Sequence, residues 1–139
     1  MTNLHLTITT PERIVLETEV SSVNVPTVEG EIGVLANHIP LVSILAPGEL
    51  HAIAADGMEQ VMAVSGGFVE VRDNKVVILA DTAEKAEEID EARAEAGREK
   101  ARQLMQERAT DDVGFADAQA ALAKELARLK VVRKRRKQV

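Results

Sequence analysis

The pattern of apolar residues changes once along the chain, at Asp81, and the two parts require different secondary structure. Before Asp81, apolar and polar residues alternate with a period of two; Leu4, Leu6 and Ile8, for example, share one face of a strand. From 84 to 108 the residues are mostly Ala, Glu, Arg, Lys and Gln, which are strong helix formers. The sequence therefore predicts a strand-rich part followed by helices.

The first part divides into short apolar runs that are separated by turn signals. The later runs are 41–45, 49–54, 59–65, 68–72 and 75–80, and the turn signals are Pro47-Gly48, Asp56-Gly57, Gly66-Gly67 and Asp73-Asn74. Asp56-Gly57 is the strongest signal, because a tight two-residue hairpin needs a positive φ. A shift of the apolar phase at Ser21 and Ser22 predicts a bulge or a corner. Many short strands joined by turns predict a β-sandwich or barrel with mostly antiparallel pairing.

The second part predicts an antiparallel pair of helices, because a break at 109–114 separates two helical patterns. Asp90 is the predicted N-cap of the first helix, and the second runs from about Phe115 to the low 130s. The apolar stripes are Ala94, Gly97, Ala101, Leu104 and Met105 in the first helix, and Phe115, Ala118, Leu122, Leu126 and Leu129 in the second. Since alanine and glycine bury little apolar surface, we expect the helices to be held weakly and to have a second, detached conformation.

Composition excludes several classes of protein. The chain has no cysteine and two phenylalanines as its only aromatic residues, so its core must be aliphatic and cannot contain disulfides or thiolate metal sites. We find no apolar run of about 18 residues that could span a membrane, and no N-terminal pattern of a secretory signal. Residues 1–80 carry ten acidic and three basic groups, which argues against nucleic-acid binding by this part.

No catalytic site is predicted. The sequence contains neither a phosphate-binding loop of the G-x-x-x-x-G-K-[ST] type nor a G-x-S-x-G motif. Its carboxylates are spread along strands and helices, so that none pairs recognisably as acid and base. His5, His38 and His51 are dispersed, and we therefore expect no metal site.

The stretch EGEIGVLANHIPLV, residues 29–42, combines residues that interrupt regular structure with apolar residues that do not suit a solvated loop. Gly30 and Gly33 permit backbone angles that a side chain would forbid. Asn37 tolerates a left-handed conformation, and Pro40 fixes one dihedral angle. We expect a shaped, partly packed loop on a rigid β domain, and such loops often carry binding contacts.

This stretch resembles the glycine–histidine–proline loop of the epsilon subunit of bacterial F-type ATP synthases. Three further stretches resemble the same family, in the same order and with matching spacing: SGGFVEVRDNKVVILADTA at 65–83, IDEARA at 89–94 and DVGFADAQAALAKELARLKV at 112–131. The resemblance implies an α+β fold, in which an N-terminal ten-stranded β-sandwich, 1–83, is followed by a C-terminal antiparallel two-helix hairpin, 84–139.

The resemblance also implies a role without catalysis by this chain itself. Members of the family sit on the rotating central stalk, beside the gamma subunit and above the ring of c subunits, and help to couple proton flow to ATP synthesis. Their hairpin can extend along gamma into the catalytic head, formed by the alpha and beta subunits, and block ATP hydrolysis. This implies a peripheral position on the cytoplasmic face of the bacterial inner membrane. Two alternatives are a free-standing sandwich module with a coiled-coil dimerisation tail and a small-ligand sensor that acts alone.

Two sets of partner contacts follow from the resemblance. Contact with gamma is implied for His38, Asn37 and Pro40. Contact with the c ring is implied for Glu31 and Glu29. The alternative for the histidine is a local hydrogen bond in the loop. The alternative for the two carboxylates is plain solvation, and an exposed ion pair would contribute only about 0–1 kcal/mol.

Some members of the family bind ATP, and the resemblance places a nucleotide pocket across both helices. The matching residues are Ile89, Asp90, Arg93, Ala94, Lys124 and Arg128. Asp90 would bind the adenine amino group, and Arg93 would approach phosphate. ATP-binding members have arginine where this chain has Lys124, and lysine lacks the planar fork of arginine, so ATP would be a weak regulatory ligand. The alternative is a capped helix start with an Asp90–Arg93 pair. No other cofactor is expected.

Positive charge gathers at the C-terminal end of the chain. The resemblance implies that this tail enters the catalytic head, meets acidic groups there and inhibits hydrolysis. Its residues are Arg133, Lys134, Arg135, Arg136 and Lys137. One alternative is a frayed, solvated charge run, and another is contact with anionic lipid or nucleic acid. With the resemblance, we expect no nucleic-acid partner.

Overall fold

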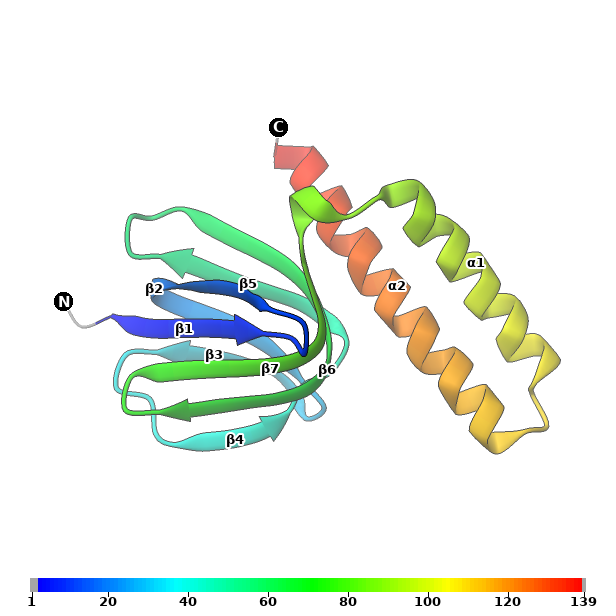
Figure 1. The fold of residues 1–139 in the computed structure, drawn as a ribbon, viewed down its shortest axis with the longest axis horizontal. Helices are drawn as coiled ribbons and strands as arrows, with labels where there is room; N and C mark the ends of the chain where they lie inside the picture. Colours follow the sequence, from blue (N-terminus) through cyan, green and yellow to red (C-terminus); the bar gives the residue numbers. More distant parts are fainter. Residues whose placement is uncertain (1–2, 139) are drawn as a thin grey trace.

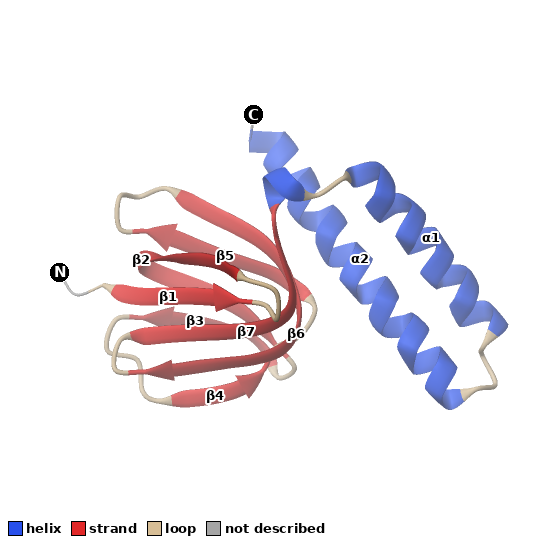
Figure 2. Cartoon of the chain, in the orientation of Figure 1, coloured by secondary structure: helices blue, strands red, loops and turns tan. Residues whose placement is uncertain are grey.

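A computed structural model of the chain describes residues 3–138, and of residues 135–138 only the backbone. The strands are β1 (Leu4–Thr9), β2 (Ile14–Thr27), β3 (Gly30–Leu35), β4 (Leu41–Ile44), β5 (Gly48–Ala54), β6 (Glu59–Arg72) and β7 (Lys75–Lys85). A short 3-10 helix, η1 (Ala86–Glu88), leads to α1 (Glu91–Glu107) and α2 (Asp112–Gln138). The strands all precede the helices in the chain (Figure 1), and the β part and the helical hairpin lie side by side as separate bodies (Figure 2). The predicted α+β class is confirmed.

The described strands form one continuous hydrogen-bonded sheet that closes on itself as a sandwich. The order is β1-β7-β6-β5-β2-β3, with β4 on β6 and a further pairing between β1 and β2. Only β1 and β7 run parallel among these pairs. Because β1 pairs with both β7 and β2, it closes a ring of β1, β7, β6, β5 and β2, with β3 outside it on β2, and this closure protects most backbone edges from water.

The structure has seven strands among the described residues, where the resemblance implied ten. The difference arises because the long strands β2 and β6 change partners along their length without ending, and β7 continues on β6 beyond the part that pairs with β1. The Gly66-Gly67 signal, which predicted a turn, is instead a bend inside β6, where both glycines have positive φ. Before the bend β6 pairs with β5, and after it with β4. The predicted irregularity at Ser21 and Ser22 is confirmed as a register shift in the β2–β5 pair.

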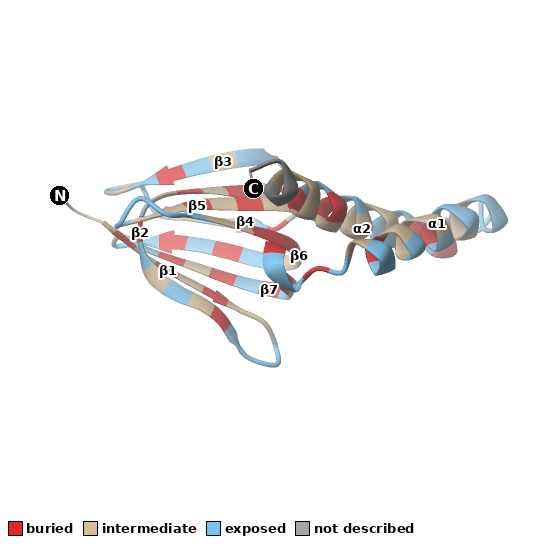
Figure 3. Cartoon of the chain, turned by 90° about the horizontal axis from the view of Figure 1, so that it is seen from above, coloured by how far each residue is buried: buried red, intermediate tan, exposed pale blue. Residues whose placement is uncertain are grey.

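The core of the sandwich is aliphatic, as the composition predicted. Strand β1 alternates buried and half-buried residues along its length, and β2 and β7 continue the pattern (Figure 3). The largest fully buried side chains of the described residues include Leu4, Leu6, Ile8, Leu50, Met62 and Ile78. Each such side chain stabilises the fold by about 1.5–3 kcal/mol when it leaves water, so the sandwich is one cooperative unit.

The first helix begins where the sequence predicted, and the second begins earlier. Strand β7 continues to Lys85 and η1 follows it, so the helix formers from 84 to 89 lie outside α1, which begins at Glu91. Asp90 is the N-cap, as predicted, and its side chain accepts a hydrogen bond from the Arg93 amide. Helix α2 begins at Asp112, earlier than the predicted Phe115. Acidic residues suit a first helical turn because they interact with the free amides and the helix dipole.

The hairpin touches the sandwich through α2, and α1 packs mainly on the outer side of α2 (Figure 1). The apolar seam between α2 and the sandwich is small: its buried residues are Ala63, Ala86, Ile89 and Val131. The predicted stripe of α2 is correct for Ala118 and Leu129 but wrong for Leu126, which is 47% exposed. In this turn Ala127 is buried instead. Within residues 3–138, no helix is long and apolar enough to cross a membrane.

Candidate functional site

The stretch at 29–42 is less irregular than predicted: β3 and β4 occupy most of it, and only 36–40 connects them. Asn37 adopts the left-handed conformation, with φ of 67°. Its amide donates a hydrogen bond to Asn74 Oδ1 at 2.6 Å, which ties the connection to the β6–β7 turn. The predicted Asp73-Asn74 turn is confirmed, since both residues have positive φ. The connection is therefore a shaped loop on a rigid support.

His38 makes the local hydrogen bond that was the alternative to a partner contact. Its Nδ1 lies 2.6 Å from the Ile39 carbonyl oxygen, which accepts the hydrogen bond. The ring is still half-exposed, while Ile39 is 73% exposed and Pro40 is also at the surface. The loop thus offers an imidazole edge and two apolar side chains to an approaching surface, in a conformation that is already ordered.

Glu29 and Glu31 lie at the other end of β3 from His38. A strand rises by about 3.3 Å per residue, so about 13 Å separates Glu31 from Leu35, the last residue of β3 before the connection that carries His38. The turn before β3 is held by Thr27, whose buried hydroxyl donates to the Gly30 carbonyl and accepts from the Glu29 amide. Both carboxylates are exposed. The structure therefore presents the two predicted contact regions as separate surfaces at opposite ends of one strand.

An exposed apolar surface that the sequence did not predict covers the outside of β4, β6 and β7. We call it the outer apolar face; it consists of Val42, Ile44, Phe68 and Leu79. Phe68 lies opposite Ile44 on one side and opposite Leu79 on the other, so the side chains form a row across three strands. All four are more than half exposed. The signal was present in the runs LVSI and VVIL, which are apolar on both faces of a strand.

The residues matched to a nucleotide pocket have structural roles in this conformation. Ile89 and Ala94 are buried, and Asp90 caps α1, as the alternative reading expected. Of the cations, Arg93 is exposed and Lys124 is half-buried. Arg93 and Lys124 therefore do not form a recognisable cluster of cations around one cavity.

Arg128 is already engaged by two carboxylates. Its Nη1 donates to Glu125 Oε2 at 2.9 Å, and its Nε lies 3.0 Å from Glu84 Oε1. The Nε–H is not aimed at that oxygen, so the contact with Glu84 is an ion pair rather than a hydrogen bond. The Arg128 side chain is only 16% exposed. A phosphate could reach this guanidinium only after the carboxylates had moved.

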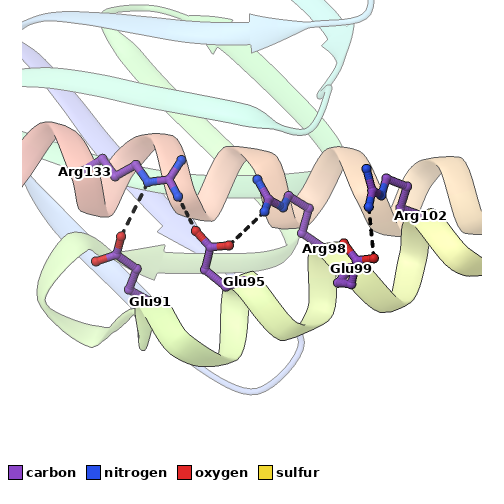
Figure 4. A network of polar contacts seen from close by, with 6 residues as sticks. All are labelled: Glu91, Glu95, Arg98, Glu99, Arg102 and Arg133. Carbon is purple, nitrogen blue, oxygen red and sulfur yellow. Dashed lines mark hydrogen bonds and ion pairs between the residues drawn. The ribbon is translucent and has the colours of Figure 1, made fainter.

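The C-terminal residues continue α2 to Gln138, so the alternative prediction of a frayed tail is wrong for the backbone that the structure describes. Arg133 donates to Glu91 and to Glu95 of α1, and Glu95 also accepts from Arg98, 2.9 Å away (Figure 4). One turn further along α1, Glu99 and Arg102 form a second ion pair of the same i,i+3 kind (Figure 4). These contacts connect the end of α2 to the start of α1.

Of the remaining tail residues, the structure describes the side chain of one, Lys134. Lys134 Nζ lies 2.6 Å from Glu49 Oε1 of β5. Arg135, Arg136 and Lys137 lie outside the residues whose side chains are described. The described part of the basic tail is thus paired with carboxylates of the same chain.

The histidines do not form a site together. His5 Nδ1 lies 2.8 Å from Glu19 Oε1 and its Nε2 lies 3.2 Å from Glu17 Oε1, and hydrogen bonding to these two carboxylates raises the pKa of His5. His51 lies 3.4 Å from Glu59, on a different pair of strands. Among residues 3–138 no three histidine or acidic side chains are grouped so as to hold a metal ion.

Two family models match consecutive parts of the chain. Residues 3–86 match the beta-sandwich domain of the ATP synthase Delta/Epsilon chain, and residues 87–133 match the long alpha-helix domain of the same chain. Together they cover almost all of the described sequence, and their boundary falls just after β7.

Curated relatives agree with these models. The ATP synthase epsilon chain of Herpetosiphon aurantiacus is 49% identical over 134 residues, which are 96% of each chain. That of Nitratidesulfovibrio vulgaris is 47% identical over 129 residues, 93% of this chain and 95% of the relative. A solved chain of the Euglena gracilis mitochondrial ATP synthase is 32% identical and superposes with a TM-score of 0.80. The match covers 91% of this chain and 79% of the solved chain. The chain therefore belongs to the ATP synthase delta/epsilon family, among the bacterial epsilon chains, which are non-catalytic components of the synthase central stalk.

Proposed function

We propose that this chain couples proton transport to ATP synthesis and restrains ATP hydrolysis through movement of its helical hairpin. The sandwich anchors the chain to the gamma subunit and the c ring, on the cytoplasmic face of the bacterial inner membrane. The hairpin alternates between the compact pose described above and an extended pose in which it reaches the alpha and beta subunits. A partner groove in the catalytic head would favour the extended pose by binding it preferentially.

The observation that carries this proposal is the unequal burial in the two parts of the chain. The sandwich contains a large, continuous aliphatic core, in which many side chains are completely buried. The seam that holds α2 on the sandwich has four buried residues, of which Ala63 and Ala86 are alanines, and only Val61 and Val132 pack against them as partly buried apolar residues. Apolar burial contributes about 25 cal/mol per Å², so this seam contributes little compared with the core. The hairpin can therefore leave while the sandwich stays folded.

The outer apolar face supports docking of the sandwich to a partner. Ile44, Phe68 and Leu79 form one row, with Val42 on the same side of β4, and contiguous exposed apolar patches usually mark an interaction site. The loop that carries Asn37, His38 and Pro40 leads directly into β4, whose Val42 and Ile44 belong to this face. We propose that gamma covers both the loop and this face. The exposed Glu31, at the far end of β3, would then be left for the c ring, with Glu29 beside it.

A charge on the outer apolar face should prevent this docking. We expect Phe68→Glu to weaken binding of the chain to ATP synthase depleted of this subunit by roughly tenfold or more, because the carboxylate would have to be buried against an apolar surface. Binding is measured by titrating labelled chain onto the depleted complex. The fold should survive, since Phe68 is 53% exposed.

Met58→Glu is the matched control for this experiment. Met58 is 63% exposed in the β5–β6 connection, away from the outer apolar face, and the same change of charge there should leave binding unaltered. Equal binding of both variants and the unchanged chain would show that gamma docks elsewhere.

We propose that any binding of ATP is weak. Arg128 would have to give up its ion pairs with Glu84 and Glu125 to bind phosphate. Lys124 supplies a point charge rather than the planar pair of donors of an arginine. Calorimetric titration of the isolated chain should therefore give a dissociation constant well above the micromolar range. Lys124→Arg, which restores the planar donor, should tighten binding several-fold. A low-micromolar constant for the unchanged chain would contradict this proposal.

A further inference from the structure

The sandwich presents a carboxylate to α2 on each side of the apolar seam. Glu49 of β5 lies opposite Ala63 of β6, and Ala63 lies opposite Glu84 of β7. Residues that are directly opposite share one face of a sheet, so these three side chains form a row. Ala63 belongs to the seam together with Val131 of α2. Helix α2 therefore lies over an alanine that is flanked by two acidic side chains.

Each of these carboxylates meets basic side chains of α2. Lys134 Nζ lies 2.6 Å from Glu49 Oε1, and Lys130 Nζ lies 3.8 Å from Glu49 Oε2. On the other flank, Arg128 Nε lies 3.0 Å from Glu84 Oε1. The two flanks are not equivalent. Arg128 also forms an ion pair with Glu125 of its own helix, whereas both lysines pair with Glu49 of the sandwich. The contact that depends most on docking is thus the one at Glu49.

The burial of Glu49 makes its contacts sensitive to charge. Its side chain is 9% exposed, and a buried carboxylate is unfavourable unless a cation and a hydrogen bond compensate for the lost hydration. Lys134 provides both in the docked pose. When α2 leaves, water hydrates the separated charges instead, so the net preference is small and the contact is reversible.

A groove lies beside this contact, between α2 and strands β2, β3 and β5. Its volume is about 740 Å³, and its lining includes Glu31, Glu49, His51 and Lys130. Lys130 is 71% exposed, so ions from solution can reach it. Salt screens exposed charges over about 10 Å at 0.1 M ionic strength, and Lys134 is also 41% exposed, so salt weakens the attraction of both lysines to Glu49.

We propose that Glu49 is an electrostatic latch, which holds α2 on the sandwich through Lys130 and Lys134 and masks these lysines from other acidic surfaces. Salt or a more acidic partner competes for the lysines and releases the hairpin. The consequence for the assembled enzyme rests on the proposed brake, whereas the latch itself is a property of the isolated chain and can be tested there.

The test measures the distance between the sandwich and α1 with two spin labels. The chain has no cysteine, so Met58→Cys and Gln103→Cys, both at exposed positions, can be labelled selectively. Glu49→Lys places like charges together and should raise the detached fraction by roughly tenfold. Lys134→Glu should do the same from the helix side without altering the sandwich, and the double charge swap should restore the docked distance.

The response to salt distinguishes a latch from a general structural role. Added salt should increase the detached fraction of the unchanged chain and decrease that of Glu49→Lys, because it screens attraction in the first and repulsion in the second. Glu70→Lys makes the same change of charge at an exposed position of β6 beyond its bend, opposite Val77 of β7, and should keep the docked distance.

Docked distances for both Glu49→Lys and Lys134→Glu would overturn the latch, and so would a charge swap that fails to restore docking. The assembled enzyme separates this outcome from failure of the brake. If the hairpin of Glu49→Lys is detached in the isolated chain while ATP hydrolysis by the complex is unchanged, the latch stands and the proposed brake is wrong.

Discussion

Replacing Gly67 with alanine should destabilise the sandwich by about 4 kcal/mol or more, which is a large part of the stability of a small domain. A Cβ at this position would lie 1.7 Å from the Leu79 carbonyl oxygen and 2.8 Å from the Leu79 carbonyl carbon. These are backbone atoms of the paired strand β7, so they cannot rotate away as a flexible side chain could. Gly67 also has φ of +100°, which L side chains rarely adopt. Urea unfolding followed by circular dichroism measures the loss.

Gly57→Ala is the control that separates crowding from backbone strain. Gly57 has φ of +90°, close to that of Gly67, but a Cβ there would meet no atom within 4 Å. Its cost should be about 1–2 kcal/mol, the usual penalty for a side chain in the left-handed region. If the two variants lose equal stability, then the approach of β7 to Gly67 is not what makes glycine necessary in β6.

Deleting residues 130–139 should raise ATP hydrolysis by the assembled enzyme about two- to tenfold. The rate is proportional to the fraction of enzyme that is not inhibited, so this range corresponds to a brake that holds half to nine-tenths of the molecules. The deletion removes the basic side chains, including Arg133 and Lys134, that the proposal places against acidic groups of the catalytic head. Steady-state hydrolysis by membranes that contain the truncated chain measures the effect.

Deletion of residues 138–139 alone is the matched control, because it shortens the chain but keeps all of the basic residues. It should leave the hydrolysis rate unchanged. Assembly must be checked for both truncations, and we expect it to be intact because the sandwich is not altered. Equal hydrolysis by the long truncation, the short truncation and the full chain would contradict a brake in this segment.

Local patterns in the sequence predicted those features that depend on a few neighbouring residues. The alternation through Leu4, Leu6 and Ile8 predicted a buried strand, and these residues are fully buried. Asp90 was recognised as a cap because an N-cap needs only the backbone amides of the next turn. Gly57 was recognised as a turn residue because its requirement for positive φ is also local, although the connection has four residues rather than the two of the tight hairpin that was predicted.

The errors arose where a local signal permits two outcomes. Gly66-Gly67 permits positive φ in a turn and equally in a bend, and the pairing of β6 with β7 on both sides of it selects the bend. Leu126 fits the apolar spacing of α2, but it lies in the open groove beside the sandwich, and Ala127 is buried instead. Helix formers from 84 onward did not prevent β7 from reaching Lys85, because pairing with Met62 of β6 outweighs the weak helix preference.

The sequence by itself determined the order of strands and helices, the aliphatic core and the family resemblance, because periodicity and turn chemistry act over a few residues. Only the tertiary structure decided which surfaces and charges come together. Phe68 and Leu79 became one exposed row, and Glu49 came to lie under Lys134, 85 positions further along the chain. Strand register and helix docking set such neighbours, and both are decided by how the whole chain packs rather than by any single segment.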